Sequence, residues 1–272
     1  MKNKKIKVLI FGAGAIGRGF LAPLLYSKNF SITFVEVNKN LINLLKKNNY
    51  YYSAFTKKNN YDLKKIYFDG VFHIDEKFDI KNYDILFSCV GPKQCLKIIS
   101  KFKDAKKIFI CENDIKLKEI IQKKLKTKQV YFCIPDVITS NTAPSSLMKK
   151  DKLCTVSEKG ILVMEKNPIN FNGIFKKVNS KFLIKHWNCK LFIHNAPHAI
   201  VAYLGKIKKH KYIHQAMNDK IIKDIVTKSL KEITEGLIFS KLVDKKFANF
   251  YKKKELNRFK NKLLFDPISR VG

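Results

Sequence analysis

Short apolar runs alternate with helical patterns through the first half of the chain. Residues 5–11 and 31–38 have the pattern of strands, and residues 15–27 between them have apolar positions at helical spacing. Three more strand-like runs follow, separated by helical patterns: YDILFSCVG, KKIFICEN and QVYFCIP. Strands that alternate with helices build a parallel sheet. Residues 1–150 are therefore predicted to form an α/β domain with a Rossmann-type, doubly wound parallel sheet.

The pattern changes in the second half of the chain. A turn-rich stretch, SNTAPSSLM, marks an expected boundary, and residues 152–166 alternate weakly, as a strand does. From Asn195 onward the apolar positions recur at helical spacing, most clearly in residues 219–239. The sequence thus predicts a second, mostly α-helical domain over residues 151–272, which carries substrate binding and catalysis.

The chain has 272 residues and a net charge of +33. The excess is lysine, scattered together with Asn, Ile, Phe and Tyr, which is typical of AT-rich codon usage and not of a basic binding tail. The sequence has no arginine-rich or aromatic-interleaved patch, no run long enough to span a membrane, and no CxxC pair. We expect a cytoplasmic protein, a monomer or small homo-oligomer, that binds a small molecule but no nucleic acid, membrane or metal.

The segment FGAGAIGRGF places three glycines in G-x-G-x-x-G spacing, after a strand and at the start of a helix. That context is what dinucleotide binding requires. Gly12 permits a tight turn, Gly14 lets the backbone approach a pyrophosphate, and Gly17 lets the helix pack closely on the sheet. The pyrophosphate is expected at the helix N-terminus. The predicted cofactor contacts here are Phe11, Gly12, Ala13, Gly14, Ala15, Ile16 and Gly17.

Glu36 ends the second predicted strand, nineteen residues after Gly17, where an acidic side chain accepts hydrogen bonds from the adenosine ribose. Because a carboxylate repels a 2′-phosphate, NAD is favoured over NADP as the cofactor, although Lys39 lies nearby. Two later strand ends are expected to line the same site, since ligands of open α/β sheets bind there. They contribute the predicted cofactor contacts Val90, Gly91, Glu112 and Asn113.

The run KLFIHNAPHAIVAYLG holds Lys190, Asn195 and His198 among apolar residues. Pro197 is tolerated in the first turn of a helix, so a helix is expected to start at Asn195 or Ala196, with the polar groups at its entrance and not on a buried face. Each group alone has an ordinary explanation, as a snorkelling lysine, a capping asparagine and a satisfied histidine. Together, beside a nicotinamide site, they supply what alcohol oxidation needs: a base, and groups that hydrogen-bond the reacting oxygen.

Four segments resemble, in the right order, the mannitol-1-phosphate 5-dehydrogenase branch of the polyol-specific long-chain dehydrogenase (mannitol dehydrogenase) family. They are FGAGAIGRGF, CEN, KLFIHNAPHAIVAYLGKIKKH and NRFKNKLLFDPISRVG. The resemblance implies an NAD-dependent dehydrogenase that interconverts a polyol, such as mannitol 1-phosphate, and the matching ketose. It implies Lys190 as general base, with Asn195 and His198 binding and polarising the reacting oxygen. Weaker expected substrate contacts are Arg258, Asn261, Arg270, His194 and Lys206.

The chain also departs from the family pattern. Val137 stands where an arginine is usual, Phe132 where a polar side chain is common, and Lys262 where a proline is usual. The chain ends at SRVG, whereas family members usually continue with more basic residues, which weakens the expectation of a phosphorylated substrate. Two alternatives stay open: an enzyme of the ketopantoate reductase or hydroxyacid dehydrogenase type, and a catalytically degenerate relative that binds NAD without turnover.

Overall fold

The computed structural model describes residues 5–26 and 29–271. The chain divides into two compact units, Met1–Val178 and Asn179–Gly272, which we call unit 1 and unit 2. The division differs from the expected boundary after residue 150. Residues 151–178 belong to unit 1 because their strands pair with strands of the N-terminal part of the chain.

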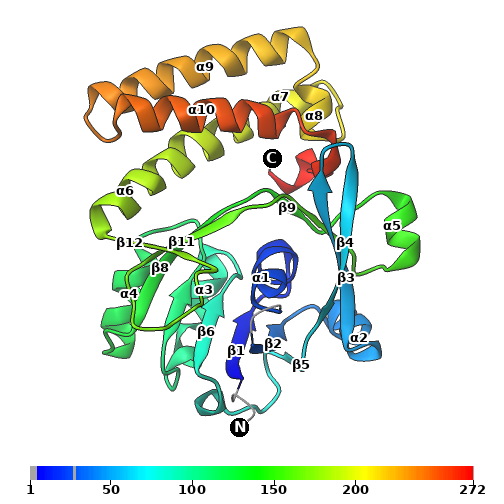
Figure 1. Ribbon diagram of the computed structural model, residues 1–272, viewed down its shortest axis with the longest axis vertical. Coiled ribbons are helices and arrows are strands. Elements are labelled where there is room, and N and C mark those ends of the chain that lie inside the picture. Colours follow the sequence, from blue (N-terminus) through cyan, green and yellow to red (C-terminus); the bar gives the residue numbers. More distant parts are fainter. Residues whose placement is uncertain (1–4, 27–28, 272) are drawn as a thin grey trace. The chain divides into compact units, whose positions relative to one another are not determined.

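Among the described residues, unit 1 contains an eight-stranded sheet in the order β12-β11-β8-β7-β6-β1-β2-β5 (Figure 1). Its strands are β1 (Ile6–Phe11), β2 (Phe30–Glu36), β5 (Gly70–His73), β6 (Ile85–Ser88), β7 (Ile108–Ile110), β8 (Val130–Asp136), β11 (Ile161–Glu165) and β12 (Lys176–Val178). From β8 to β5 all neighbours pair in parallel, whereas β11 pairs antiparallel with β8. The strand order from β5 to β8 is that of a Rossmann sheet, so the predicted fold class is confirmed.

The sheet of unit 1 is covered by apolar side chains on both faces, which is why its strands are continuous apolar runs. Val8, Leu9, Ile10 and Phe11 of β1 are all fully buried. An aromatic cluster packs on the sheet, with the ring of Phe171 lying 5.5 Å from that of Phe109, centroid to centroid. Since Phe171 lies in the segment that follows residue 150, this packing also ties that segment to unit 1.

A smaller sheet in unit 1 has the order β4-β3-β10-β9. Its strands are β3 (Tyr50–Lys57), β4 (Asn60–Tyr67), β9 (Thr139–Ser140) and β10 (Thr155–Ser157). The α-helices of unit 1 are α1 (Ala22–Tyr26), α2 (Lys39–Lys47), α3 (Pro92–Ile98), α4 (Leu117–Leu125) and α5 (Ser145–Lys150). A π-helical turn, η1 (Gly17–Leu21), leads into α1, and η2 (Ile80–Asn82) and η3 (Ile99–Phe102) are short 3₁₀ turns.

The regular elements of unit 2 are helices in its described residues, apart from a single β-bridge between Tyr212 and Pro267, which confirms the expected mostly helical C-terminal region. Its elements are α6 (Ser180–Asn188), η4 (Cys189–Asn195), α7 (Ala196–Ile207), α8 (Ile213–Ala216), α9 (Lys220–Phe239), α10 (Lys245–Phe259), η5 (Lys262–Leu264) and η6 (Ile268–Arg270). Side-chain caps begin three of these helices: Asn179 for α6, Asp219 for α9 and Asp244 for α10 accept backbone N–H groups of the first turn. In the part of the chain that the structure describes, no helix is both long and apolar enough to cross a membrane.

Candidate functional site

The glycine loop between β1 and η1 is packed tightly at two of its three glycines. Gly12 has a φ of +93°, and a Cβ there would lie 2.5 Å from the carbonyl oxygen of Cys89. A Cβ at Gly17 would overlap the carbonyl oxygen of Gly12. A Cβ at Gly14, in contrast, would meet no atom within 4 Å. The fold itself therefore needs Gly12 and Gly17, whereas the absence of a side chain at Gly14 leaves open space beside the loop.

That space belongs to a cavity of about 500 Å³ whose lining includes Gly12, Gly14, Glu36, Val37, Val90 and Gln94. The cavity brings together three of the predicted cofactor segments: the glycine loop, the end of β2 and the loop after β6. Their meeting follows from the sheet order, because β1 lies between β2 and β6 and all three are parallel. The carboxyl ends of neighbouring parallel strands share one edge of the sheet.

Glu36 is tied to the glycine loop by its carboxylate. One oxygen accepts the backbone N–H of Ala13 at 2.9 Å, and the other accepts those of Val37 and Asn38 at 2.8 and 3.0 Å. A carboxylate has about four acceptor sites, so these three bonds leave capacity for one more. Glu36 thus holds the loop in shape and keeps room for a hydroxyl donor.

Glu112, predicted as a direct cofactor contact, lies buried beneath the loop after β6. Its carboxylate accepts the Ser88 hydroxyl at 2.7 Å and the backbone N–H groups of Val90 and Gly91 at 2.9 and 2.8 Å. Burial raises the pKa of this carboxyl group, and the hydrogen bonds that it accepts offset only part of that effect. Glu112 therefore shapes the loop in which Gly91 adopts a φ of +90°, while its neighbour Asn113 is exposed.

The remaining predicted cofactor contacts differ in whether their side chains or only their backbone groups are accessible. The side chains of Phe11 and Ala13 are fully buried in the core of unit 1, so only their backbone groups are available. Ala15 and Ile16 are half-buried and open the helical segment. These placements agree with a loop that binds through backbone N–H groups, as a helix N-terminus does.

Arg18 was missed by the sequence analysis. Its side chain is 4 % exposed, its Nε donates to the Ala13 carbonyl at 3.1 Å, and one terminal nitrogen donates to the Leu153 carbonyl. The guanidinium lies 5.4 Å from the ring centroid of Tyr51, whose hydroxyl donates to the Arg18 carbonyl at 2.5 Å. Arg18 thus holds the glycine loop to the smaller sheet. The available signal was a lone arginine inside the apolar helical run that follows the glycines.

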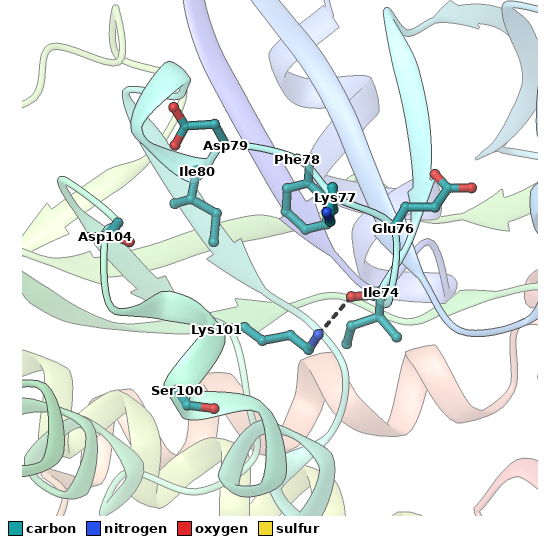
Figure 2. A pocket seen from close by; sticks show the side chains of 9 residues that line it. All are labelled: Ile74, Glu76, Lys77, Phe78, Asp79, Ile80, Ser100, Lys101 and Asp104. Carbon is teal, nitrogen blue, oxygen red and sulfur yellow. Dashed lines mark hydrogen bonds between the residues drawn. The ribbon is translucent and has the colours of Figure 1, made fainter.

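A second cavity of unit 1, of about 600 Å³, contains none of the predicted site residues (Figure 2). Its lining includes Glu76, Asp79 and Asp104 as well as Lys77 and Lys101. The ammonium group of Lys101 donates to the carbonyl of Ile74 at 2.8 Å, as Figure 2 shows. The charges of the lining are mixed, and one of its cations already has a backbone partner within the fold.

In unit 2 the predicted catalytic residues lie on one continuous helical segment, α6–η4–α7. The α-helix α7 begins at Ala196, as expected, but it continues the helical turn before it: Asn195 has helical angles, φ −65° and ψ −44°, and its side chain makes no capping bond. The chain reaches Pro197 through the π-helical turn η4, and proline lacks the N–H that a helix interior uses. The expectation that the polar groups avoid a buried face is wrong, because Lys190 and His198 are each 6 % exposed.

The π-turn changes which side chains share a face. In a π-helix the backbone hydrogen bonds join residues five apart, so each turn holds more residues than in an α-helix, and Lys190 and Asn195 lie about one turn apart on the same side. Asn195 and His198 are separated by three residues, which are neighbours on an α-helix. The structure thus places the three predicted catalytic residues on one stretch of helix surface. Regular α-helical geometry would turn Lys190 away from Asn195.

His198 is held by a carboxylate. Its Nε2 donates to Oδ2 of Asp266 at 2.8 Å, and Oδ1 of the same carboxylate accepts from Arg270 at 2.6 and 3.0 Å. Burial raises the pKa of Asp266, but the bond from His198 and the charge of Arg270 outweigh it and lower the pKa to about 2. Neither Asp266 nor its pairing with His198 was predicted. The available signal was the aspartate between Asn261 and Arg270.

A parallel arrangement lies one helical turn earlier. His194 pairs with Glu255, and the other oxygen of Glu255 accepts from Arg258 at 2.7 Å. The ring of Phe259 stacks on His198 at 5.3 Å between centroids and contacts His194 at 5.8 Å. In the described part of the chain, no group of three His, Cys, Asp or Glu side chains is arranged to hold a metal ion.

Three of the weaker substrate candidates have side-chain contacts within unit 2. Arg258 is 7 % exposed and pairs with Glu255. The side chain of Asn261 caps η5 by accepting the N–H of Leu263 at 3.0 Å. Arg270 is the most accessible of the three, with 37 % of its side chain exposed, although it pairs with Asp266. Their contact with substrate stays a prediction.

Comparison with known proteins gives matches in both units. Residues 6–133 match the mannitol dehydrogenase Rossmann domain, and residues 183–272 match the mannitol dehydrogenase C-terminal domain. The chain is 32% identical to a mannitol-1-phosphate 5-dehydrogenase of Buchnera aphidicola, over 98% of this chain and 76% of the relative. It is 29% identical to the mannitol-1-phosphate 5-dehydrogenase of Thermoanaerobacter pseudethanolicus, with the same coverage.

A solved structure shares the fold. The mannitol 2-dehydrogenase of Pseudomonas fluorescens, solved as a ternary complex with NAD and D-mannitol, superposes with a TM-score of 0.79 at 15% identity, covering 99% of this chain and 71% of that one. The family matches confirm the resemblance expected from the sequence and the oxidoreductase class that it implies. The chain belongs to the mannitol dehydrogenase family.

Proposed function

We propose that this protein is an NAD-dependent polyol dehydrogenase that interconverts a sugar-alcohol phosphate, such as mannitol 1-phosphate, and the matching ketose, with Lys190 as general base. The carrying observation is the helical segment on which a π-turn aligns buried Lys190 with Asn195, next to a His198 that Asp266 holds. Relatives about 30% identical over 98% of the chain that are named mannitol-1-phosphate 5-dehydrogenase support the substrate class.

Unit 1 fits the cofactor. The space that Gly14 leaves open suits a pyrophosphate, which would lie against the N-terminus of the helical segment that starts at Ala15. Glu36 has acceptor capacity left for a ribose hydroxyl, and its negative charge disfavours the 2′-phosphate of NADP. Bound there, NAD would supply the acceptor for the hydride that leaves the carbinol carbon.

In the proposed reaction, side chains of unit 2 accept the hydroxyl proton of the substrate and hydrogen-bond its reacting oxygen. Oxidation of the alcohol requires the neutral amine of Lys190 to accept the hydroxyl proton as the hydride leaves. Asn195 donates its amide N–H to the oxygen as its charge changes, and His198 binds and orients the same oxygen. In the reverse direction the ammonium group of Lys190 returns the proton to the ketose oxygen.

A substrate panel tests this function. The protein is offered polyols, polyol phosphates and ketose phosphates with NAD or NADP, and the absorbance of the reduced nicotinamide is followed. We expect turnover with a hexitol phosphate and NAD that exceeds turnover with the free hexitol. A folded protein that binds NADH but turns over no member of the panel would instead fit a degenerate relative. Turnover of 2-hydroxy acids or ketopantoate would assign the chain to that alternative class.

A further inference from the structure

Arg18 is a buried cation directly after the glycine loop of unit 1. It is the second residue of η1 and is 4 % exposed. Its Nε donates to the Ala13 carbonyl at 3.1 Å, and a terminal nitrogen donates to the Leu153 carbonyl. Both acceptors are uncharged backbone groups. Within residues 5–26 and 29–271, no carboxylate forms an ion pair with Arg18.

The other neighbours of Arg18 do not supply a counter-ion. The guanidinium lies 5.4 Å from the ring centroid of Tyr51, but burial raises the pKa of that phenol, so it stays neutral. The carboxylate of Asp151 accepts two backbone N–H groups, at 2.7 and 2.8 Å. Burial lowers the pKa of Arg18, and the more distant charges of Asp151 and Glu36 offset only part of that effect. Since arginine stays protonated in proteins, a cation is buried here without a paired anion.

The packing around Arg18 holds it in the interior. A Cβ at Gly19 would lie 2.5 Å from the hydroxyl oxygen of Thr139, so the residue after Arg18 is packed closely against β9. On the other side, the Tyr51 hydroxyl donates to the Arg18 carbonyl at 2.5 Å. A buried charge without a counter-ion is costly in free energy, and folded proteins normally pair such charges. An anion bound beside the loop would supply the counter-ion that the fold lacks.

The bond to Ala13 connects this charge with the cofactor cavity. The Ala13 carbonyl and the Gly14 N–H belong to one peptide group, and in a trans peptide they point in opposite directions. Arg18 binds the carbonyl, so the Gly14 N–H faces away from Arg18, and no acceptor of the described chain meets it. Gly14 lines the cavity of about 500 Å³. A cation on the carbonyl also polarises the peptide and strengthens its N–H as a donor.

We propose that Arg18 is a positioning residue for the cofactor: its buried charge attracts the pyrophosphate of NAD across the Ala13–Gly14 peptide, and its bond to Ala13 fixes the direction of the Gly14 N–H. The inference rests on the proposed function, in which this loop binds the pyrophosphate. The loop by itself offers an anion backbone N–H groups and a helix N-terminus. Arg18 adds a full charge, which acts over a longer distance than a hydrogen bond in a medium of low dielectric constant.

Arg18→Met and Arg18→Lys form the test pair, because the two side chains have similar lengths and differ in charge. Calorimetry measures the Kd of ADP-ribose, which contains the pyrophosphate, and NMR titration measures the Kd of adenosine, which is uncharged. We expect Arg18→Met to weaken the binding of ADP-ribose about tenfold or more, since a charge interaction is lost. The affinity for adenosine should stay parental. Arg18→Lys should retain most of the affinity for ADP-ribose, although it lacks the planar fork of arginine.

A purely structural role of Arg18 gives a different pattern. If Arg18 only holds the loop in shape, both variants should lose affinity alike. Adenosine should then weaken together with ADP-ribose, because Glu36 is bonded to the same loop. Either result would overturn the proposal. Lys57→Met is the control for the loss of one positive charge from unit 1, since Lys57 is exposed at the end of β3 and should leave both Kd values parental.

The parent protein supplies a measurement that requires no folded variant. The ¹⁵N resonance of Arg18 Nε should shift when ADP-ribose is added and stay in place with adenosine. An unmoved resonance in the presence of bound ADP-ribose would refute the assignment. A parent that binds NADH but turns over no member of the substrate panel would remove the proposed activity and leave the role of Arg18 intact. A parent that binds neither NADH nor ADP-ribose would remove the cofactor site, and with it this role.

Discussion

At the scale of single residues, each unit orients polar side chains by hydrogen bonds. In unit 2, Asp266 accepts from His198; in unit 1, Glu36 accepts backbone N–H groups and Glu112 supports a loop. Lys190 is 6 % exposed, on the same stretch of helix. His198, Glu36 and Glu112 are each oriented by the groups to which they are hydrogen-bonded.

Replacement of Lys190 tests the general base. Lys190→Ala should lose on the order of 10²–10⁴-fold in turnover, the usual contribution of a positioned general acid–base. NADH affinity should be retained, because Lys190 lies outside unit 1. Steady-state rates and calorimetric titration with NADH measure the two effects. Lys185→Ala is the matched control, since Lys185 forms a partly exposed ion pair with Asp244 and should keep parental turnover. Parental turnover in a folded Lys190→Ala protein would remove the mechanism.

Gly14 tests the pyrophosphate site. Gly14→Val should fold, because a Cβ there meets no atom within 4 Å. Its side chain should fill the space of the pyrophosphate and abolish NADH binding, measured by calorimetry. Gly236→Ala is the control, since Gly236 also has open space, within α9, and alanine is the better helix former. Unchanged NADH affinity in folded Gly14→Val would mean that the pyrophosphate does not lie against this loop.

Asp266 also affects stability in acid. Its pKa in the folded protein is lowered from 3.8 to about 2, because His198 and Arg270 outweigh the effect of burial. The ionised group therefore contributes stability above about pH 4 that is lost as the pH falls toward about 2, on the order of 2 kcal/mol. Asp266→Asn should lose less free energy of unfolding over this range than the parent. Urea titrations at a series of pH values measure it, and equal losses would contradict the prediction.

At the scale of elements, the π-turn η4 determines which side chains of one helix act together. In a helix with α-geometry throughout, two residues five apart would not lie on the same face, so Lys190 would point away from Asn195. The turn lies directly before Pro197, where an α-helical backbone would lack a hydrogen bond. The segment before Pro197, which by sequence resembles only a helix start, thus contains the π-turn that brings Lys190 and Asn195 to one face.

Insertion of one alanine after Phe192 tests the role of the π-turn. Phe192 lies within η4 and is 39 % exposed, so the added residue should not disturb the core. It places Lys190 and Asn195 six residues apart, a spacing that shares a face neither in an α-helix nor in a π-turn. We expect near-parental helix content by circular dichroism and a loss of turnover of at least about 10²-fold, since misplaced catalytic groups cost that much. Phe192→Ala keeps the chain length and should retain most activity. Equal activity of the two variants would contradict this role.

At the scale of the whole molecule, the division of the chain follows strand pairing and not the turn-rich stretch after residue 140. Strands β10 and β11 complete the two sheets of unit 1, and Leu153 and Phe171 join its core. The excess of lysine residues does not explain this division of the chain. We expect it to affect solubility and association rates more than fold.

Two fragments test the division. Residues 1–178 should fold cooperatively and bind NADH, because they contain both sheets and the glycine loop. Residues 1–150 should not, because they lack β10, β11 and β12 and leave apolar core positions open. Thermal unfolding and NADH titration distinguish the two. Stable NADH binding by the shorter fragment would restore the boundary that the sequence suggested.

The sequence by itself determined the features that depend on local pattern. The alternation of strands and helices, the glycine spacing and the acidic residue at the end of β2 are local, so the Rossmann sheet was predictable, and the family resemblance followed from ordered motifs. Lys190, Asn195 and His198 were found the same way, as an unusual group of polar residues within one short run.

Only the tertiary structure decided how those residues are held. Asp266 reaches His198, and Leu153 reaches Arg18, across chain separations that no periodicity records. The π-turn was hidden because Pro197 fits a helix start equally well by sequence rules, and the choice depends on the helix α6 that precedes it. Residues 151–178 joined unit 1 because strand pairing is non-local: a strand is stable only where an open edge and a matching core exist, and both were formed by residues far earlier in the chain.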